Sequence, residues 1–407
     1  MNNLDSTNSA QQKIDGPLAG IKILDIGTMI AAPLAGGILA DQGAEVIKIE
    51  PPGIGDLMRY VGASCNGVSA IYQNVNRGKR SLALNLKTAG GVEVLHRLIK
   101  EVDVILHNFR PGVAERLQAD YATLSALNPQ LIYLSVTGFG HEGPMAGKAA
   151  YDNVVQAFAG VAMTQNDKRI GEPSQYQQLF ADKLTANMAC QAITAALFAR
   201  ERGAGGQHVQ LAMVDAVASF LWVDKSGTAQ FTSEDAHGGL QPSADPRLLK
   251  FKNGYAQAAP VSDADFHGWC AAFDVDSSDP GLATIMDRSA HNHLVVDISN
   301  QVFARALELD VDETLAKLEA AGVPCAKANA LEELPGNAQM QANGLFVQSH
   351  HPVAGPMVEP QNPVHFSKTP SGCAPPSASL GAHTEAILGE LGFAEEDITR
   401  LRDGGAL

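Results

Sequence analysis

Short apolar runs alternate with helical patterns along the first part of the chain. The run IKILDI (21–26) is bounded by glycine and is typical of a buried strand. The small-residue stretch AAPLAGGILADQG (31–43) favours a helix that ends at Gly43, and AEVIKIE (44–50) predicts the next strand. These three segments predict one βαβ unit with a right-handed crossover and a parallel strand pair.

The same alternation continues to residue 136. Strands are predicted at 81–87, 102–109 and 131–136, and helices over 88–101 and near 113–119 lie between them. Alternation of strand and helix over such a length predicts an α/β fold, with a large domain that is doubly wound and Rossmann-like.

The pattern changes after the Gly-rich turn GFGHEGP (138–144). Helical segments are predicted near 151–163 and 183–202, and a strand and a helix follow within 205–222. The loop 233–247 is rich in Gly, Pro and Asp, and it marks a domain boundary.

The next segment, 248–330, predicts a smaller α+β unit. It opens with a hairpin-like pattern around Asn253–Gly254. Beyond 331 the chain is rich in Pro and Gly, and a final helix is predicted over 384–392. We therefore expect a flexible N-terminus, a large domain completed by the C-terminal segment, and a small domain between its two parts: 1–15; 16–225 with 331–407; and 226–330.

Composition and charge narrow the class of partner. The net charge of −15 argues against nucleic acid and against an anionic membrane surface. No apolar stretch is long enough to span a membrane, and the polar start of the chain does not resemble a signal peptide. Five scattered cysteines without a CxxC motif suit the reducing cytoplasm, with neither disulfides nor zinc.

A basic island interrupts the acidic balance between Arg77 and Arg116. A small, multiply charged anion is the ligand that this island suggests, and a solvated surface patch is the alternative. The island holds four acidic residues, Glu93, Glu101, Asp103 and Glu115, against eight basic ones, Arg77, Lys79, Arg80, Lys87, Arg97, Lys100, Arg110 and Arg116.

Several common catalytic motifs are absent. The first βα turn lacks GxGxxG and a P-loop lysine, which disfavours NAD or ATP. Neither HExxH nor GxSxG occurs, so that neither a metal nor a serine nucleophile is expected. The small residues Ala31, Ala32 and Gly36 allow close approach of a ligand or, more simply, of a neighbouring helix. His141, in the Gly-rich turn, is a minor catalytic candidate.

The stretch QQLFADKLTANMACQAITAALFAR (177–200) predicts a helix from Lys183 onward, preceded by Asp182. On local rules Asp182 is an N-cap, because a carboxylate there accepts hydrogen bonds from free backbone amides. The alternative is that Asp182 reacts.

The blocks GIKILDIGTMIAAPLAGGILADQGAEVIKIEPPGIGD, NRGKRSLALNLK, DVILHNFRPGVAERL and LNPQLIYLSVTGFGHEGP resemble, in order and spacing, the family III coenzyme A transferases. The resemblance continues through YDNVVQAFAG and returns near the C-terminus in HFSKTPSGCAPPSASLGAHTEAILGELGF, so that it covers about residues 16–225 and 315–393.

The resemblance implies transfer of CoA from an acyl-CoA thioester to a free carboxylic acid. Asp182 matches the position of the family's aspartate nucleophile, which carries an aspartyl-CoA thioester intermediate. Asp152 is implied to assist or to anchor the fold. The helix dipole would keep Asp182 ionised, and the free amides of the helix would stabilise tetrahedral oxyanions. No metal or permanent cofactor is implied, since CoA is a substrate.

The resemblance also assigns the basic island to CoA. Residues after the predicted strands would line the adenosine and phosphate site, Arg116 would reach a phosphate, and the first βα turn would approach the pantetheine. Lys79 and Arg80 are either structural or peripheral. The CoA-binding set is Ile30, Ala31, Leu84, Asn85, Lys87, Asn108, Phe109, Arg110, Arg116 and Tyr151.

Some features depart from the family or leave alternatives. Oxalate-acting members carry Gln at the position of Ile30, and their Gly-rich active-site loop is represented only by HGGLQ (237–241). An α-methylacyl-CoA racemase is the runner-up, but its histidine base is replaced by Tyr151, a poor base near neutral pH. A non-catalytic CoA-binding protein is a third interpretation. The family implies an interlocked homodimer.

Overall fold

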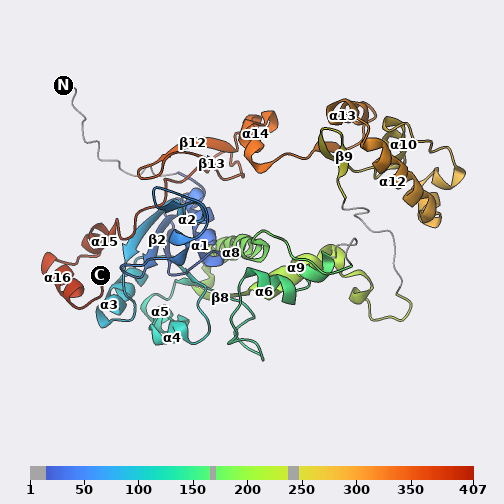
Figure 1. The fold of residues 1–407 in the computed structure, drawn as a ribbon. Coiled ribbons are helices and arrows are strands. Elements are labelled where there is room, and N and C mark those ends of the chain that lie inside the picture. The colour runs from blue at the N-terminus through green and yellow to red at the C-terminus, as the bar shows by residue number, and fades with distance from the viewer. Residues whose placement is uncertain (1–14, 166–170, 237–246) are drawn as a thin grey trace, which may run out of the picture. The chain divides into compact units, whose positions relative to one another are not determined.

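The computed structural model describes residues 15–165, 171–236 and 247–407 (Figure 1). The chain divides into two compact units, Met1–Ser226 with Gln341–Leu407, and Gly227–Met340. The chain therefore returns from the small unit to the large unit near residue 340, whereas we predicted this boundary near residue 330. The expected flexible N-terminus lies, apart from Asp15, outside the described residues, as does the HGGLQ loop.

The large unit is built on a six-stranded sheet in the order β5-β2-β1-β6-β7-β8, in which every neighbouring pair is parallel. This is the order of a doubly wound Rossmann-like fold, with its switch point between β1 and β6. The expected α/β class is thus confirmed. The strands are β1 (Lys22–Asp25), β2 (Glu45–Glu50), β5 (Lys79–Ala83), β6 (Val104–His107), β7 (Ile132–Thr137) and β8 (Gln207–Ala212).

Two hydrophobic cores cover the two faces of the sheet. Because successive strand residues point to opposite faces, Ile23 belongs to one core and Leu24 to the other. The first core is covered by α1 (Ala31–Asp41), α6 (Asp152–Phe158), α7 (Val161–Thr164), α8 (Phe180–Ala199) and α9 (Met213–Lys225). The second is covered by α3 (Ala89–Ile99), α5 (Tyr121–Leu127), α15 (Thr384–Glu390) and α16 (Glu395–Asp403).

Several boundaries differ from the expectation. The strand expected at 81–87 runs from Lys79 to Ala83, so that the family-like LNLK segment lies in the following loop. The helix expected to be last, α15, is followed by α16, whose sequence is mostly charged. Few apolar positions in α16 enter the core, which is why its hydrophobic pattern is weak.

Shorter elements of the large unit are α2 (Ala70–Asn76), α4 (Val113–Arg116), β3 (Ser64–Cys65), β4 (Val68–Ser69) and the hairpin β12 (Phe346–His351) with β13 (Gly355–Pro360).

The small unit is α+β, as its pattern predicts. The hairpin around Asn253–Gly254 forms, and its second strand also pairs antiparallel with a third strand. Trp269 and Phe273 contribute to its own core. Its main elements are β9 (Leu249–Phe251), β10 (Gly254–Ala258), β11 (Cys325–Lys327), α10 (Asp263–Ala272), α11 (Ile285–Ala290), α12 (Asn292–Ala306) and α13 (Val311–Ala320), and α14 (Ala338–Ala342) spans the unit boundary.

A buried charge cluster lies under the first βα loop. Lys79 Nζ donates to Asp25 Oδ2 at 2.8 Å, to Asn76 Oδ1 at 2.8 Å and to the Pro33 carbonyl at 2.5 Å. Burial lowers the pKa of Lys79 to about 8. Gly36 gives this side chain room, because a Cβ there would lie 3.3 Å from Lys79 Cε.

Lys48 extends the cluster toward the loop itself. Its Nζ lies 3.1 Å from Asp56 Oδ2 and 3.7 Å from Asp25 Oδ2, and it donates to the Gly27 carbonyl at 3.0 Å. Asp56 in turn accepts the backbone N–H of Met29, whose φ of 66° is unusual for a residue other than glycine. The cluster therefore fixes the backbone of Gly27–Met29.

Removal of the Lys79 cation should destabilise the fold strongly. We expect Lys79→Met to lower the free energy of unfolding by about 3–5 kcal/mol, because it leaves the buried Asp25 carboxylate poorly paired. Urea denaturation measures the change.

The matched control is Arg80→Met at the next residue. Arg80 pairs with Glu390 at the surface, and its loss should cost about 0–1 kcal/mol. Equal losses of stability in the two variants would contradict a special role of the buried cluster.

Candidate active site

Asp182 lies in the first turn of α8, inside the helix. The N-cap is Leu179, which makes no side-chain cap hydrogen bond, so our prediction that Asp182 is the N-cap is wrong. The helix begins earlier than its local pattern suggests because Ala181 is fully buried and Phe180 packs against the first core. Tertiary packing therefore extends α8 toward the N-terminus, so that the helix begins at Phe180 and includes Asp182.

Asp152, in the first turn of α6, supplies a cap to α8 from outside that helix. Its Oδ2 accepts the backbone N–H of Asp182 at 2.9 Å, although the two residues are distant in sequence. An N–H in the first turn of a helix needs such an acceptor, because no earlier carbonyl is available to it. The Asp182 amide, which we expected to be free for an oxyanion, is therefore occupied.

Gln156, one turn after Asp152, fixes this arrangement, although we did not predict a role for it from the sequence. Its Nε2 donates to Asp152 Oδ1 at 2.5 Å and to the Gln178 carbonyl at 3.1 Å. Its Oε1 accepts the N–H of Tyr176 at 3.0 Å. Gln156 thus joins α6 to the segment that leads into α8. Its spacing of four from Asp152 is the only sequence signal for this role.

The electrostatic environment of Asp182 is opposite to what we expected. Burial, and then the negative charge of Asp152, raise the pKa of Asp182 to about 7. We had expected the helix N-terminus to keep the carboxylate fully ionised. A carboxyl with this pKa is only partly ionised near neutral pH. A titratable carboxyl with so large a shift, beside a second carboxylate, is typical of a functional site.

The first βα loop meets the loop after β6 at the switch point of the sheet. Thr28 N–H donates to Asn108 Oδ1 at 2.9 Å, and Asn108 Nδ2 donates to the Thr28 carbonyl at 2.7 Å. Two segments of the expected CoA site, far apart in sequence, are therefore side by side. Crevices at this point of doubly wound sheets are the usual ligand sites.

The expected CoA-binding side chains differ in exposure. Ile30, Ala31 and Leu84 are buried in the cores, so that only their backbone is available to a ligand. Asn85 donates to the Gly405 carbonyl at 3.2 Å, whereas the Tyr151 side chain is 62% exposed. Phe109 is half-buried, and its ring stacks on His107 with the ring centroids 5.0 Å apart.

Half of the basic island forms ion pairs with carboxylates of the same chain, some buried and some at the surface. The paired members are Arg77 with Asp41, Lys79 with Asp25, Arg80 with Glu390 and Arg97 with Glu93. Within the part of the chain that the structure describes, the other four members, Lys87, Lys100, Arg110 and Arg116, are exposed and form no ion pair. Lys87 and Arg110 follow the carboxyl ends of β5 and β6.

The minor candidate His141 belongs to a polar cluster on β7 and β8. Its Nε2 lies 2.9 Å from Ser135 Oγ, which also lies 2.8 Å from His208 Nε2. Burial lowers the pKa of both imidazoles. The small residues of α1, by contrast, behave as the simpler interpretation expects: Ala31 and Ala32 share a core with Ala186 of α8.

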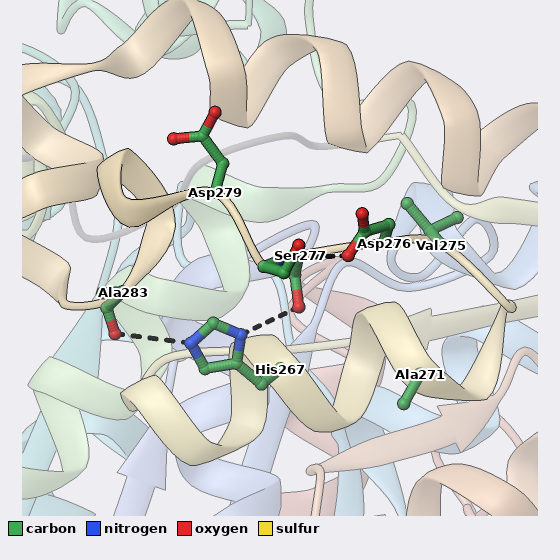
Figure 2. Close-up of a pocket in the computed structure, with 8 residues that line it drawn as sticks. His267, Ala271, Val275, Asp276, Ser277, Asp279 and Ala283 are labelled. Atoms are coloured by element: carbon green, nitrogen blue, oxygen red, sulfur yellow. Dashed lines mark hydrogen bonds between the residues drawn. The ribbon is translucent and has the colours of Figure 1, made fainter.

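A hollow of about 470 Å³ lies in the small unit, lined by His267, Asp276 and Ser277 among others (Figure 2). His267 Nε2 lies 3.3 Å from the Ala283 carbonyl, and Nδ1 lies 2.8 Å from Ser277 Oγ. Since a carbonyl only accepts, Nε2 donates and Nδ1 accepts the Ser277 hydroxyl. Both ring nitrogens are occupied, which indicates a structural role for this histidine.

The described residues contain neither a membrane-spanning helix nor a metal-binding cluster. No helix there is both long and apolar enough to cross a membrane, and no group of three or more His, Cys, Asp or Glu side chains is arranged to hold a metal ion.

Comparison with known proteins identifies the class. The sequence matches CoA-transferase family III over residues 18–384. It is 32% identical to a succinate–glutarate CoA-transferase of Agrobacterium fabrum, over 94% of this chain and 98% of the relative. It is 31% identical to a formyl-CoA:oxalate CoA-transferase of Escherichia coli, over 96% of this chain and 99% of the relative.

Solved structures agree with this result. A CAIB/BAIF family protein from Brucella suis superimposes with a TM-score of 0.79 at 30% identity, over 93% of this chain and all of that one. A Mycobacterium tuberculosis protein in an orthorhombic crystal form gives the same TM-score at 25% identity, over 92% and 99%. The chain belongs to CoA-transferase family III, and it is an enzyme of the class that transfers coenzyme A.

The pKa of Asp182 should fall when the neighbouring charge is removed. In the wild type, kcat/KM for CoA transfer should rise with pH through the Asp182 pKa near 7, which gives the acidic limb of the profile. We expect Asp152→Asn to move this acidic limb to lower pH, because the repulsion that disfavours ionised Asp182 is lost. A ¹³C NMR titration of the Asp182 carboxyl reports the same pKa without turnover.

Asp215→Asn is the matched control, because Asp215 lies in the first turn of the neighbouring helix α9 and is exposed. It should leave the limb in place. A limb that stays near pH 7 or moves upward in Asp152→Asn would contradict the account.

Proposed function

We propose that the enzyme transfers CoA from an acyl-CoA to a free carboxylic acid through an aspartyl-CoA thioester on Asp182. The observation that carries this proposal is the position of Asp182: a carboxyl group in the first turn of α8, partly buried, with its amide held by Asp152. Membership of CoA-transferase family III supplies the reaction class.

The steps balance without a metal or a redox partner. An ionised Asp182 oxygen attacks the donor thioester carbonyl, the C–S bond breaks, and a mixed anhydride and CoA thiolate form. The thiolate then attacks the Asp182 carbonyl and releases the donor acid as a carboxylate. The acceptor carboxylate attacks the carbonyl of the resulting aspartyl-CoA thioester, its C–S bond breaks, and a second mixed anhydride and CoA thiolate form. The thiolate then attacks the acceptor's carbonyl in this anhydride, which gives the new acyl-CoA and releases Asp182 as a carboxylate.

The raised pKa of Asp182 suits this sequence. A carboxylate that is destabilised by burial and by a neighbouring charge gains more from becoming a neutral acyl group than an exposed one does. Burial and the charge of Asp152 both act in this direction. Asp152 in our proposal also holds the α8 backbone in place while the bond at Asp182 forms and breaks.

CoA is proposed to bind along the carboxyl edge of the sheet. The exposed cations Lys87, Arg110 and Arg116 would contact its phosphates. The two guanidinium groups can bind phosphate oxygens through paired hydrogen bonds, and the lysine ammonium binds them as a point charge. The fixed Gly27–Met29 loop would present the backbone of Ile30 and Ala31 to the pantetheine. Asn85, Asn108, Phe109 and Tyr151 complete the proposed contacts.

A homodimer, interlocked as the family resemblance implies, is proposed as the working assembly. Large apolar side chains that are more than half exposed occur on α6 to α9, namely Phe158, Met163, Phe198, Trp222 and Val223. Exposed apolar side chains in such number are typical of an interface between subunits. Sedimentation velocity tests this proposal: a boundary at dimer mass supports it, and a boundary at monomer mass contradicts it.

Neither alternative gains support from the geometry. The racemase base would have to be Tyr151, for which the structure gives no contact with an acidic or basic side chain among the described residues. A non-catalytic CoA-binding protein is disfavoured by the named activities of the relatives.

Replacement of Asp182 should separate chemistry from binding. We expect Asp182→Asn to lower transfer at least about a thousandfold, since the amide is a poor nucleophile, while CoA affinity stays close to that of the wild type. Succinyl-CoA, glutaryl-CoA and formyl-CoA are donors to assay, with the corresponding free acids and oxalate as acceptors.

Asp215→Asn again serves as the control, because it makes the same change at the matching position of α9 and should keep full activity. Transfer by Asp182→Asn at the wild-type rate would overturn the assignment of the nucleophile.

A further inference from the structure

The segment Phe109–Ala119 carries two exposed arginines, Arg110 and Arg116, that form no ion pair with a described residue. It follows β6 and contains only the single turn of α4 as regular structure. In the proposed function these arginines hold CoA phosphates. A short loop that binds phosphate tightly must be held in place before the ligand arrives, because ordering it during binding would cost affinity.

Two buried side chains connect the beginning of this segment to its end. His107 Nδ1 lies 3.1 Å from the backbone N of Phe109, and His107 Nε2 lies 2.8 Å from Tyr133 Oη. Tyr133 Oη lies 2.8 Å from the Ala119 carbonyl oxygen. The contacts thus run from Phe109 through both rings to Ala119.

Only one arrangement of protons satisfies all three contacts. The Ala119 carbonyl only accepts, so the single hydroxyl proton of Tyr133 is donated to it. His107 Nε2 must then carry a proton and donate to Tyr133, which leaves Nδ1 as the acceptor for the Phe109 N–H. His107 is therefore neutral, and burial, with the nearby His208 and His141, lowers its pKa to about 3.

We propose that His107 and Tyr133 are positioning residues that hold the segment Phe109–Ala119, and with it Arg110 and Arg116, in the geometry that binds the phosphates of CoA. This inference rests on the proposed function. Neither side chain is proposed to contact CoA, since both are buried. They act through the two ends of the segment that they bind.

Packing holds the two rings as firmly as the hydrogen bonds do. The Phe109 ring stacks on His107, and Tyr133 lies edge-on to His208 with centroids 4.9 Å apart. Tyr121 lies 5.6 Å from Tyr133 on another side. Ring contacts on several sides therefore restrain the His107–Tyr133 pair in addition to its hydrogen bonds.

The experiment measures CoA affinity by isothermal titration calorimetry in variants that remove the Tyr133 hydroxyl or the His107 imidazole. Tyr133→Phe keeps the ring and breaks the link to Ala119, and we expect CoA to bind about tenfold more weakly. His107→Asn keeps an acceptor near the position of Nδ1 for the Phe109 N–H but loses the hydrogen bond to Tyr133. Its CoA affinity should therefore be about the same as that of Tyr133→Phe. His107→Leu loses both links and should be weaker still.

Tyr121→Phe is the matched control, because it makes the same change in the same ring cluster at a hydroxyl with no hydrogen bond to a described residue. It should bind CoA like the wild type. Thermal melts of each variant show that the folded protein is being titrated.

A double-mutant cycle separates positioning from general loss of structure. If the pair acts through the arginines, Tyr133→Phe should change CoA affinity by less than about twofold in a background of Arg110→Ala with Arg116→Ala. An unchanged affinity in Tyr133→Phe, or a full tenfold loss in the arginine-free background, would overturn the inference.

These outcomes are distinct from failure of the proposed function. If the wild-type protein does not bind CoA, the proposed function fails, and this inference fails with it. If the wild type binds CoA and the variants bind equally well, only the inference fails.

Discussion

The buried ion pair between Lys79 and Asp25 is the constraint on which the geometry of this site depends. Two charges removed from water are stable only if they meet each other and fill their remaining hydrogen bonds. Lys79 satisfies this condition by joining β5, β1, α1 and α2 at one point. Lys48 and Asp56 continue the cluster to the backbone of Gly27 and Met29. These contacts hold the first βα loop at the switch point of the sheet, where we propose that CoA binds.

A second constraint operates around Asp182. One carboxylate, Asp152, caps α8 and at the same time raises the pKa of the proposed nucleophile by its charge. Structural stability and reactivity thus come from the same contact. Gln156 fixes the position of Asp152 by a hydrogen bond. Because its amide is neutral, the negative charge that Asp152 presents to Asp182 is not cancelled. A lysine or arginine in its place would stabilise ionised Asp182 and reduce its reactivity.

The sequence predicted the α/β sheet and its parallel pairing, because its strands are compact apolar runs and helical patterns lie between most of them. It located Asp182 but misjudged its surroundings. Burial of Phe180 and Ala181 against the core extends α8 backwards, and no local rule includes that packing. The cap comes from Asp152, on another helix.

Long-range pairing explains the other differences. Arg77 and Arg80 belong to the basic island that suggests an anionic ligand, but each pairs with a carboxylate that is distant in sequence, Asp41 and Glu390 respectively. The link from His107 through Tyr133 to Ala119 likewise has no sequence signature, since it depends on two adjacent strands and a loop. The positions of residues at strand ends were therefore predictable from the local pattern, whereas long-range side-chain partners were not.

The central claim is that Asp182 becomes covalently attached to CoA during transfer. The most direct measurement is peptide mass spectrometry of the enzyme after incubation with acyl-CoA donors and no acceptor, with hydroxylamine added to a parallel sample. The account predicts a CoA thioester on the peptide that contains Asp182 and, with hydroxylamine, a hydroxamate at the same residue. An active enzyme that shows no adduct, or an adduct at a different residue, would contradict it.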